Sequence, residues 1–160
     1  MTSIPERFSC KECLAPLRTL PLPVSISCVL TERCNQKCKI CGYAARKSRP
    51  RDMAFSVFRK IVLGLKDRRD CTLILTGGEP TLYPHFEEVL ELLRSFKGSV
   101  CLLTNGTPIS PTRASLFYSV PFPRQVVISL YGTASTHDEI TLSLIHISEP
   151  TSLGMISYAV

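Results

Sequence analysis

The sequence predicts an α/β fold built from parallel strands. Four short apolar segments alternate along the chain with segments whose apolar residues recur at helical spacing. The short segments are nearly continuous apolar runs, which is typical of parallel strands that are covered on both faces or closed into a barrel. At 160 residues the chain has the length of one domain with a sizeable core.

The four predicted strands are rich in β-branched and aliphatic residues and end in turn-forming residues. They are Val24–Leu30, Cys71–Thr76, Ser99–Thr104 and Gln125–Leu130. The loops that follow them read TERC, GGEP, NGT and YGT in chain order. Because parallel strands bring their carboxyl ends to one edge, we expect these four loops to converge on a single site.

Helical periodicity predicts three helices. The first runs from about Met53 to Lys66 with Asp52 as its N-cap. Its buried stripe consists of Ala54, Val57, Phe58, Ile61 and Leu65. The second is His85–Phe96, which Gly98 ends. Its buried face consists of Phe86, Val89, Leu90, Leu93 and Phe96. The third is a short helix over Pro111–Tyr118.

The most informative motif is CNQKCKIC, which places Cys34, Cys38 and Cys41 in a C-x3-C-x2-C array. The start of the chain has no basic segment followed by an apolar one, so we predict no secretion signal and expect a reducing, cytoplasmic location. In that setting the eight cysteines favour metal ligation or burial over disulfides. Those in apolar runs are predicted to be buried: Cys28, Cys71 and Cys101.

Three thiolates leave a metal site one ligand short. Soft thiolates select iron–sulfur clusters or zinc, and both ordinarily take four ligands. Residues 43–55 contain no Cys or His, which disfavours a zinc site completed nearby. A cluster with one open iron position would be a reactive centre instead. The pair Cys10 and Cys13, whose role the sequence leaves open, keeps a small zinc-binding interaction module as an alternative.

The net charge is +6, and basic residues are dense around the cysteine motif. They are Arg33, Lys37, Lys39, Arg46, Lys47, Arg49 and Arg51. This density fits an anionic partner, such as a nucleic acid, an acidic peptide or a flavodoxin-like electron donor. A solvated loop explains it equally well. The sequence has no apolar run of about 18 residues, so no membrane partner is predicted.

Four motifs, in register with the predicted strands, resemble those of the radical S-adenosylmethionine superfamily. They are CNQKCKIC, LTGGEPTLYPHF, TNG and SLYG, and the resemblance runs from about Pro21 to Thr141. It implies the N-terminal part of a partial (β/α)6 TIM-like barrel, truncated after about the fourth strand. The chain then divides into a lead-in segment, residues 1–23, a truncated core, residues 24–141, and a tail, residues 142–160.

The resemblance also implies two cofactors, a [4Fe–4S] cluster and S-adenosylmethionine. Cys34, Cys38 and Cys41 would bind three irons, and the methionyl amine and carboxylate would fill the open position on the fourth. Among the other implied contacts, Gly77 and Gly78 would let the backbone approach the methionyl group, and Glu79 would accept a hydrogen bond from the methionyl amine. Pro80 would stiffen the turn, and Ile40 would pack near the adenine. Asn105 and Ser129 would contact the ribose or the carboxylate.

The implied chemistry is reductive cleavage of S-adenosylmethionine to a 5′-deoxyadenosyl radical that abstracts hydrogen from a substrate. The segment Ile128–Thr141 resembles that of peptide-modifying members with a C-terminal SPASM domain, so we expect a peptide or protein substrate. A molybdopterin-type cyclase or a tRNA-modifying enzyme is the alternative, which leaves a nucleic-acid partner open. The implied electron donor is a flavodoxin or ferredoxin. No substrate acid, base or radical relay is identified, and we expect the truncated chain to be inactive.

The tail departs from the family pattern after Thr141. Back-translated, Leu142–Thr151 matches CTG TCT CTT ATA CAC ATC TCC GAG CCC ACG, which resembles a transposon adapter used to prepare sequencing libraries. Ile156–Val160 matches the distal arm of that adapter in the same frame, and Ser152 departs from it by one base. We therefore expect residues 142–160 to be an adapter-derived artefact and not a domain. A native short strand at LSLIHI is the alternative.

Overall fold

The computed structural model describes residues 24–42, 50–120 and 124–142. The lead-in segment, Cys10 and Cys13, the basic residues Arg46, Lys47 and Arg49, and residues 143–160 of the tail lie outside these ranges. The elements, in chain order, are β1 (Val24–Thr31), α2 (Phe55–Leu65), β2 (Cys71–Gly77), the 3-10 helix η2 (Pro80–Leu82), α3 (Phe86–Leu93), β3 (Ser99–Thr104), α4 (Pro111–Tyr118), β4 (Arg124–Ile128) and α5 (Ala134–Thr141).

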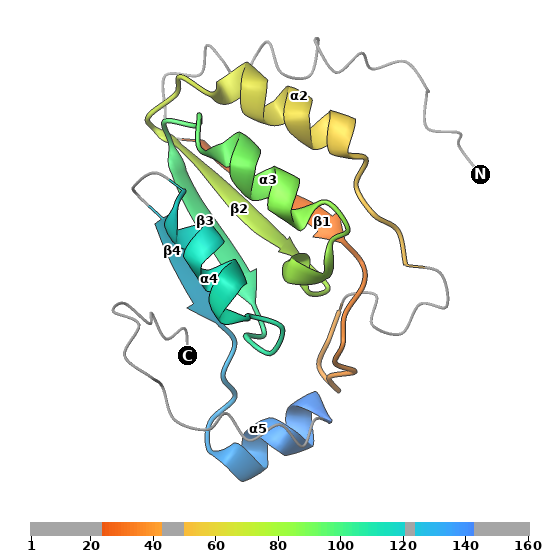
Figure 1. Cartoon of the computed structure of the whole chain (residues 1–160). Helices are drawn as coiled ribbons and strands as arrows, with labels where there is room; N and C mark the ends of the chain where they lie inside the picture. Colours follow the sequence, from red (N-terminus) through yellow and green to blue (C-terminus); the bar gives the residue numbers. More distant parts are fainter. Residues whose placement is uncertain (1–23, 43–49, 121–123, 143–160) are drawn as a thin grey trace, which may run out of the picture.

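The strands form one parallel sheet in the order β1-β2-β3-β4. Consecutive strands are therefore neighbours, and α2, α3 and α4 lie on the same face of the sheet (Figure 1). Right-handed crossovers between parallel neighbours place successive helices on one face in this way. The predicted α/β class with parallel strands is confirmed, and the order is that of one side of a (β/α) barrel.

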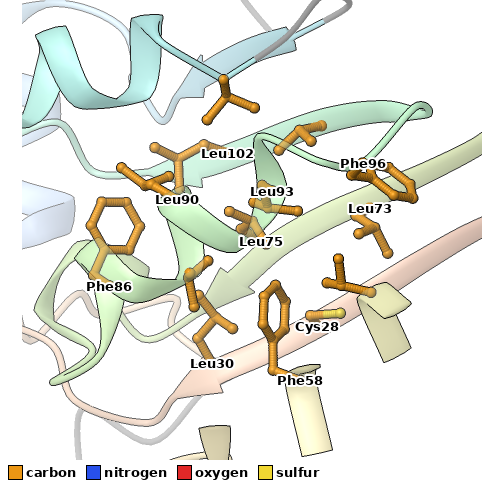
Figure 2. Packing of buried hydrophobic residues seen from close by; sticks show 14 of the residues in the cluster. Cys28, Leu30, Phe58, Leu73, Leu75, Phe86, Leu90, Leu93, Phe96 and Leu102 are labelled. Atoms are coloured by element: carbon orange, nitrogen blue, oxygen red, sulfur yellow. The ribbon is translucent and has the colours of Figure 1, made fainter. Parts of the chain in front are cut away.

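The core lies between the sheet and the helices that cover it. Aliphatic side chains from the strands meet aromatic and aliphatic side chains from α2 and α3 (Figure 2). The members with the deepest burial include Leu30, Leu73, Leu75, Phe58, Phe86, Leu90 and Leu93. Burial of each such side chain stabilises the fold by roughly 1.5–3 kcal/mol. This core fixes β1 and β2, whose ends carry the first two site loops.

The three cysteines predicted to be buried do lie in the interior, because Cys28, Cys71 and Cys101 are all buried. Burial, reinforced by the neighbouring Cys71, raises the pKa of Cys28 to about 11. A thiol with so high a pKa stays protonated at neutral pH, and the thiolate is the form that binds metals. These residues are therefore small core side chains and not ligands.

The opposite face of the sheet is less covered than the sequence predicts. Ile74 on β2 is only partly buried and Leu103 on β3 is 36% exposed, although both are apolar. Within the described ranges, helices lie over one face alone (Figure 1). In a barrel, the opposite face is the one that lines the interior. The apolar character of these strands is therefore consistent with barrel geometry.

The first helix differs from its prediction at its start and along its buried stripe. Asp52 is not the N-cap, because Ala54 occupies that position and makes no side-chain hydrogen bond to the helix. The buried residues are Phe58, Val62 and Leu65, whereas Val57 is exposed. Side chains four and three residues apart share one face of a helix, so the stripe centred on Phe58 and Val62 turns Val57 toward solvent. The buried face predicted for α3 is confirmed, but the helix ends at Leu93 rather than Phe96, which is buried beyond it.

The helix α5 was not predicted from the sequence. Thr133 caps it by accepting a hydrogen bond from the Thr136 N–H at 3.5 Å. It ends at Leu142, which has a left-handed backbone with φ of 54°. Across the described part of the chain, none of the helices combines the length and the apolar character needed to cross a membrane.

Candidate functional site

The carboxyl ends of the four strands lie at one edge of the sheet. The strand register pairs Thr31 with Gly77 and Thr104 with Ile128. Past the end of β4, the Ser129 N–H still donates to the Thr104 carbonyl at 3.1 Å. The loops after the four strands therefore start side by side, as the sequence predicts.

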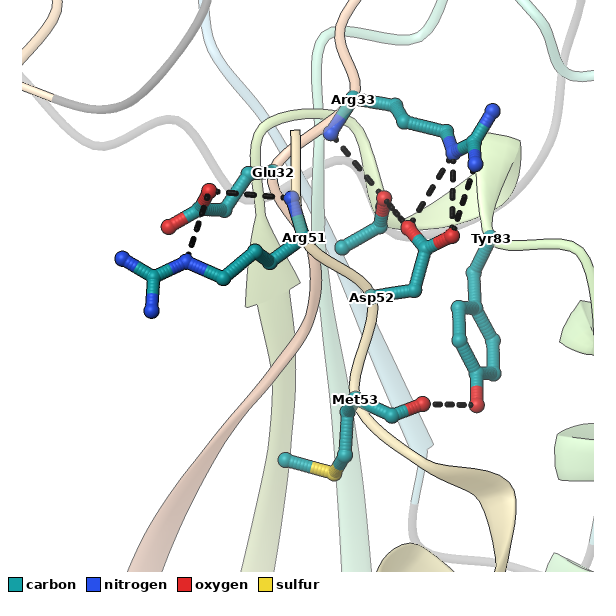
Figure 3. Close-up of polar contacts among 7 residues, drawn as sticks. Glu32, Arg33, Arg51, Asp52, Met53 and Tyr83 are labelled. Atoms are coloured by element: carbon teal, nitrogen blue, oxygen red, sulfur yellow. Dashed lines mark hydrogen bonds and ion pairs between the residues drawn. The ribbon is translucent and has the colours of Figure 1, made fainter. Parts of the chain in front are cut away.

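The cysteine loop, residues 34–41, is held at its base by Asp52 (Figure 3). The Thr31 hydroxyl donates to Asp52 Oδ1 at 2.5 Å, and Arg33 donates from Nε and Nη2 to Oδ2 at 3.1 and 2.9 Å. Burial acts to raise the pKa of Asp52, but the hydrogen bonds from Arg33 and Thr31 hold it below its usual range. The charged carboxylate thus joins the residue before Cys34 to the segment that returns from the loop.

Main-chain contacts reinforce this junction. The Glu32 N–H donates to the Arg51 carbonyl, and the Met53 N–H donates to the Leu30 carbonyl, both at 2.8 Å. The Tyr83 hydroxyl then donates to the Met53 carbonyl at 2.6 Å. Residues 51–53 are therefore fixed to the end of β1, next to Cys34, and to the end of η2.

The glycine pair of the GGEP motif lies against the backbone that leads into the cysteine loop. The Gly78 N–H donates to the Thr31 carbonyl at 2.8 Å, and the Glu79 N–H donates to the Arg33 carbonyl at 2.7 Å. A Cβ at Gly78 would lie 2.8 Å from the Arg33 carbonyl carbon and nearer still to its oxygen. A Cβ at Gly77, whose φ is +143°, would meet the Thr31 carbonyl in the same way. The missing side chains thus allow close contact between two loops, and the methionyl contact expected of them stays a prediction.

Glu79 is completely buried, and the four donors that contact its carboxylate are all neutral. Oε1 accepts from the Thr81 N–H at 3.2 Å, the Thr81 hydroxyl at 2.6 Å and the Thr104 hydroxyl at 2.7 Å. Oε2 accepts only the Asn105 N–H, at 2.8 Å, among these donors. A carboxylate has about four acceptor positions, so Oε2 keeps room for one more donor. Glu79 also caps η2, which Pro80 begins.

Asn105 carries the contact from Glu79 to the cysteine loop. Its Nδ2 donates to Asn35 Oδ1 at 2.9 Å and lies 3.8 Å from Cys34 Sγ. Thr107 fixes the side chain from the other end, because its N–H and hydroxyl donate to Asn105 Oδ1 at 3.0 and 2.8 Å. The structure therefore brings together Cys34, Glu79 and Asn105, which come from three separate loops.

Cys34, Cys38 and Cys41 are unpaired, partly buried thiols. Burial raises the pKa of Cys34, an effect that the Gln36 N–H opposes and that the charges of Glu79 and Cys41 reinforce. Burial and then the charges of Cys34 and Cys41 raise the pKa of Cys38. Soft thiolate donors of this kind fit an iron–sulfur cluster. No three His, Cys, Asp or Glu side chains of the described residues are already arranged around a metal position, so the ligand assignment stays a prediction.

Two predicted cofactor residues lie outside the network around Glu79. Ile40 is 61% exposed on the cysteine loop, and Ser129 is exposed just beyond β4. The helix α5, which follows β4, nevertheless contacts the cysteine loop. The Lys39 N–H donates to the Ile140 carbonyl at 2.8 Å, and Lys39 Nζ pairs with Glu139 at 3.2 Å.

The sequence analysis missed the residues that hold the predicted ones in place. Thr81 and Thr104 supply three of the four hydrogen bonds to Glu79, and Asp52 anchors the cysteine loop although it was predicted to cap a helix. A signal for Thr104 was present, because it is a polar residue at the end of an otherwise apolar predicted strand. Its hydroxyl therefore needed a buried partner.

Comparisons with known proteins identify the family. The sequence profile described as the radical SAM superfamily matches residues 28–148, a match that ends inside the tail segment 142–160. Mycofactocin maturase MftC of Mycobacterium tuberculosis is 30% identical over 77% of this chain. The antilisterial bacteriocin subtilosin biosynthesis protein AlbA of Bacillus subtilis is 34% identical over 54% of this chain. The aligned parts cover 32% of MftC and 19% of AlbA, so the chain spans a third or less of these relatives.

The fold is similar to that of SuiB from Streptococcus suis, solved in complex with the precursor peptide SuiA. The TM-score is 0.61 at 20% sequence identity, over 82% of this chain and 30% of SuiB. At that identity the likeness concerns the fold, which corresponds to part of a larger barrel enzyme. The sequence profile, the relatives and the fold agree: the chain belongs to the radical S-adenosylmethionine superfamily, whose members use a [4Fe–4S] cluster and S-adenosylmethionine.

Proposed function

We propose that this chain is the cofactor-binding part of a radical S-adenosylmethionine enzyme that modifies a peptide. When bound, the cluster and S-adenosylmethionine supply the one-electron cleavage that yields a 5′-deoxyadenosyl radical. The residues described above would bind and orient these two groups. Cys34, Cys38 and Cys41 would hold the cluster, and the loops after β2, β3 and β4 would hold the cosubstrate.

The observation that carries this proposal is the environment of Glu79. Its carboxylate is buried among neutral donors and keeps an acceptor position on Oε2. A buried negative charge without a neutralising partner attracts a cationic group. The ammonium group of an amino acid is such a partner, and Asn105 places this carboxylate next to Cys34.

The peptide substrate rests on the relatives rather than on residues of this chain. MftC and AlbA are named as a maturase and a bacteriocin biosynthesis protein, and the structural neighbour SuiB was solved with a precursor peptide. A peptide is therefore the substrate class that we propose, in preference to a pterin precursor or a tRNA.

An acidic one-electron donor such as a flavodoxin or ferredoxin would reduce the cluster. Lys37 is exposed on the cysteine loop between the cysteines, and Lys39 is also exposed although it pairs with Glu139. Positive charge at this position favours encounter with an acidic donor. We also propose a cytoplasmic location, where a reducing environment keeps the three site thiols free to bind iron.

The test is to load the purified chain with iron and sulfide under anaerobic conditions. We expect about four irons and four sulfides per chain and an iron–sulfur absorbance band. After reduction, S-adenosylmethionine should change the electron paramagnetic resonance spectrum of the cluster. Replacement of Cys34, Cys38 or Cys41 by Ala should abolish loading, whereas Cys101→Ala, a change in the core, should leave it intact.

Two results would contradict the proposal. One is a single tightly held zinc per chain with no labile sulfide, which would support the zinc-binding module instead. The other is a loaded cluster whose spectrum does not respond to S-adenosylmethionine. The residues Glu79 and Asn105 would then hold the loops together without binding a cosubstrate.

A further inference from the structure

Gln36 lies inside the cysteine loop, between Cys34 and Cys38. It is a polar residue, yet it is buried. The residue is 5% exposed, and its Nε2 has no hydrogen-bond partner among the described residues. An unsatisfied buried donor is destabilising by about 1–3 kcal/mol. Such groups are rare in native proteins and call for a specific explanation.

The contacts of Gln36 place it against the sulfurs of two predicted ligands. Its backbone N–H lies 3.4 Å from Cys34 Sγ. Its side-chain oxygen Oε1 accepts a hydrogen bond from the Cys38 thiol at 3.6 Å. The unpartnered Nε2 is bonded to the same carbon as Oε1, so the amide group as a whole lies beside the Cys38 sulfur.

This arrangement cannot persist once iron is bound. A sulfur that ligates iron carries no proton, so Cys38 can no longer donate to Oε1 and becomes an acceptor itself. A half turn of the amide group about the Cγ–Cδ bond exchanges the positions of its oxygen and nitrogen. That single rotation replaces an unfavourable contact between the oxygen and the sulfur with an N–H donor, and it gives Nε2 a partner. Oε1 then takes the former position of Nε2, and a carbonyl oxygen without a donor is tolerated better than an N–H without an acceptor.

We propose that Gln36 is a positioning residue whose Nε2 donates a hydrogen bond to the iron-bound sulfur of Cys38. The inference rests on the proposed function, because it requires a cluster at these cysteines. A reduced cluster carries one more negative charge than the oxidised one, and donors to its sulfurs stabilise that charge. Gln36 therefore raises the reduction potential of the cluster and makes the electron easier to accept.

The chain offers a matched control, because it contains only one other glutamine, Gln125. Gln125 is exposed near the start of β4, where it pairs with Cys101, whereas the site lies at the opposite end of the strands. A substitution there makes the same chemical change far from the cysteine loop. It separates an effect of the donor from an effect of net charge.

The experiment is a redox titration of the loaded chain, followed by electron paramagnetic resonance. Gln36→Leu removes the donor at similar volume, and Gln36→Glu replaces it with an acceptor. We expect Gln36→Leu to lower the equilibrium constant for reduction of the cluster by about tenfold, which lowers the reduction potential by about 59 mV for one electron. Gln36→Glu should lower the potential further. Gln125→Glu should have the wild-type potential. Loaded Gln36 variants with the wild-type potential would overturn the inference.

A second measurement does not depend on the variants accepting a cluster. Wild-type chain labelled with 15N at the side-chain amide of glutamine should show a 15N coupling to the reduced cluster in pulsed electron paramagnetic resonance, and Gln125→Glu should retain it. Absence of that coupling would refute the role of Nε2. Failure of the wild-type chain to assemble any cluster would instead refute the proposed function.

Discussion

Replacement of Gly78 by Ala tests whether the glycine pair is needed for contact between the first two loops. Gly78 lies on the backbone of Glu32 and Arg33, where an added Cβ would be 2.9 Å from the Glu32 carbonyl oxygen and 2.8 Å from the Arg33 carbonyl carbon. Its backbone is not in the left-handed region, so the effect of the substitution is steric. The loops must separate to make room for the methyl group.

The magnitude follows from the contacts that such a separation disturbs. A shift of about 1 Å weakens the hydrogen bonds from the N–H groups of Gly78 and Glu79, which are now 2.8 and 2.7 Å long. Each contributes about 0.5–1.5 kcal/mol, and strain from overpacking adds about 1–3 kcal/mol. We therefore expect Gly78→Ala to lower the free energy of unfolding by about 2–6 kcal/mol, with the upper end reached if both hydrogen bonds are lost.

The assay is urea denaturation of the metal-free chain, followed by circular dichroism. Gly42→Ala is the control, because no atom of the described residues other than its chain neighbours lies within 4 Å of its added Cβ, and Gly42 directly follows Cys41. That change should alter the unfolding free energy by less than about 0.5 kcal/mol. Equal stability of the two variants, with equal denaturant slopes, would show that the loops do not depend on a bare backbone at residue 78.

Three further predictions concern the supports of the site. Asp52→Asn should destabilise the chain modestly at neutral pH, because it removes the charged acceptor of a partly exposed ion pair with Arg33. The folded-state pKa of Asp52 is lowered, so this stabilisation is present above the unfolded-state pKa and is lost as pH falls through the folded-state pKa. Denaturation of both proteins from neutral to acidic pH should therefore show their stabilities converging, and a gap that persists in acid would contradict the ion pair. Thr104→Val should lower the unfolding free energy by about 1–3 kcal/mol, since Glu79 loses a buried donor, and a thermal midpoint equal to that of wild type would rule out this role. Leu142→Gly should raise the thermal midpoint by relieving about 1 kcal/mol of left-handed strain, whereas a lower midpoint would mean that the strain is absent.

The strands and the convergence of their loops were predictable because a short apolar run between turn residues has few alternative structures. Ser99–Thr104 agrees with its prediction at both ends, and the other three strands agree to within two residues. The set of buried residues along α2 was less predictable from the sequence. Val57 and Val62 are equally apolar, and only the packing of Phe58 against the sheet decides which of them is buried.

At the site, the motifs identified Cys34, Glu79 and Asn105 but not what they contact. The carboxylate of Glu79 is satisfied by Thr104, which follows it by 25 residues, and no local pattern encodes a contact over that separation. Asp52 was misread for the same reason. An acidic residue before a helix is a common cap, and its long-range partners Thr31 and Arg33 appear only when β1 is in place.

The junction at Asp52 combines one contact that responds to ionic strength with others that do not. The ion pair between Arg33 and Asp52 is partly exposed to solvent, so dissolved salt screens it. The two main-chain hydrogen bonds beside it, from Glu32 to Arg51 and from Met53 to Leu30, join uncharged groups and are screened far less. The end of β1 should therefore stay connected to residues 51–53 at high salt, even where the ion pair contributes little.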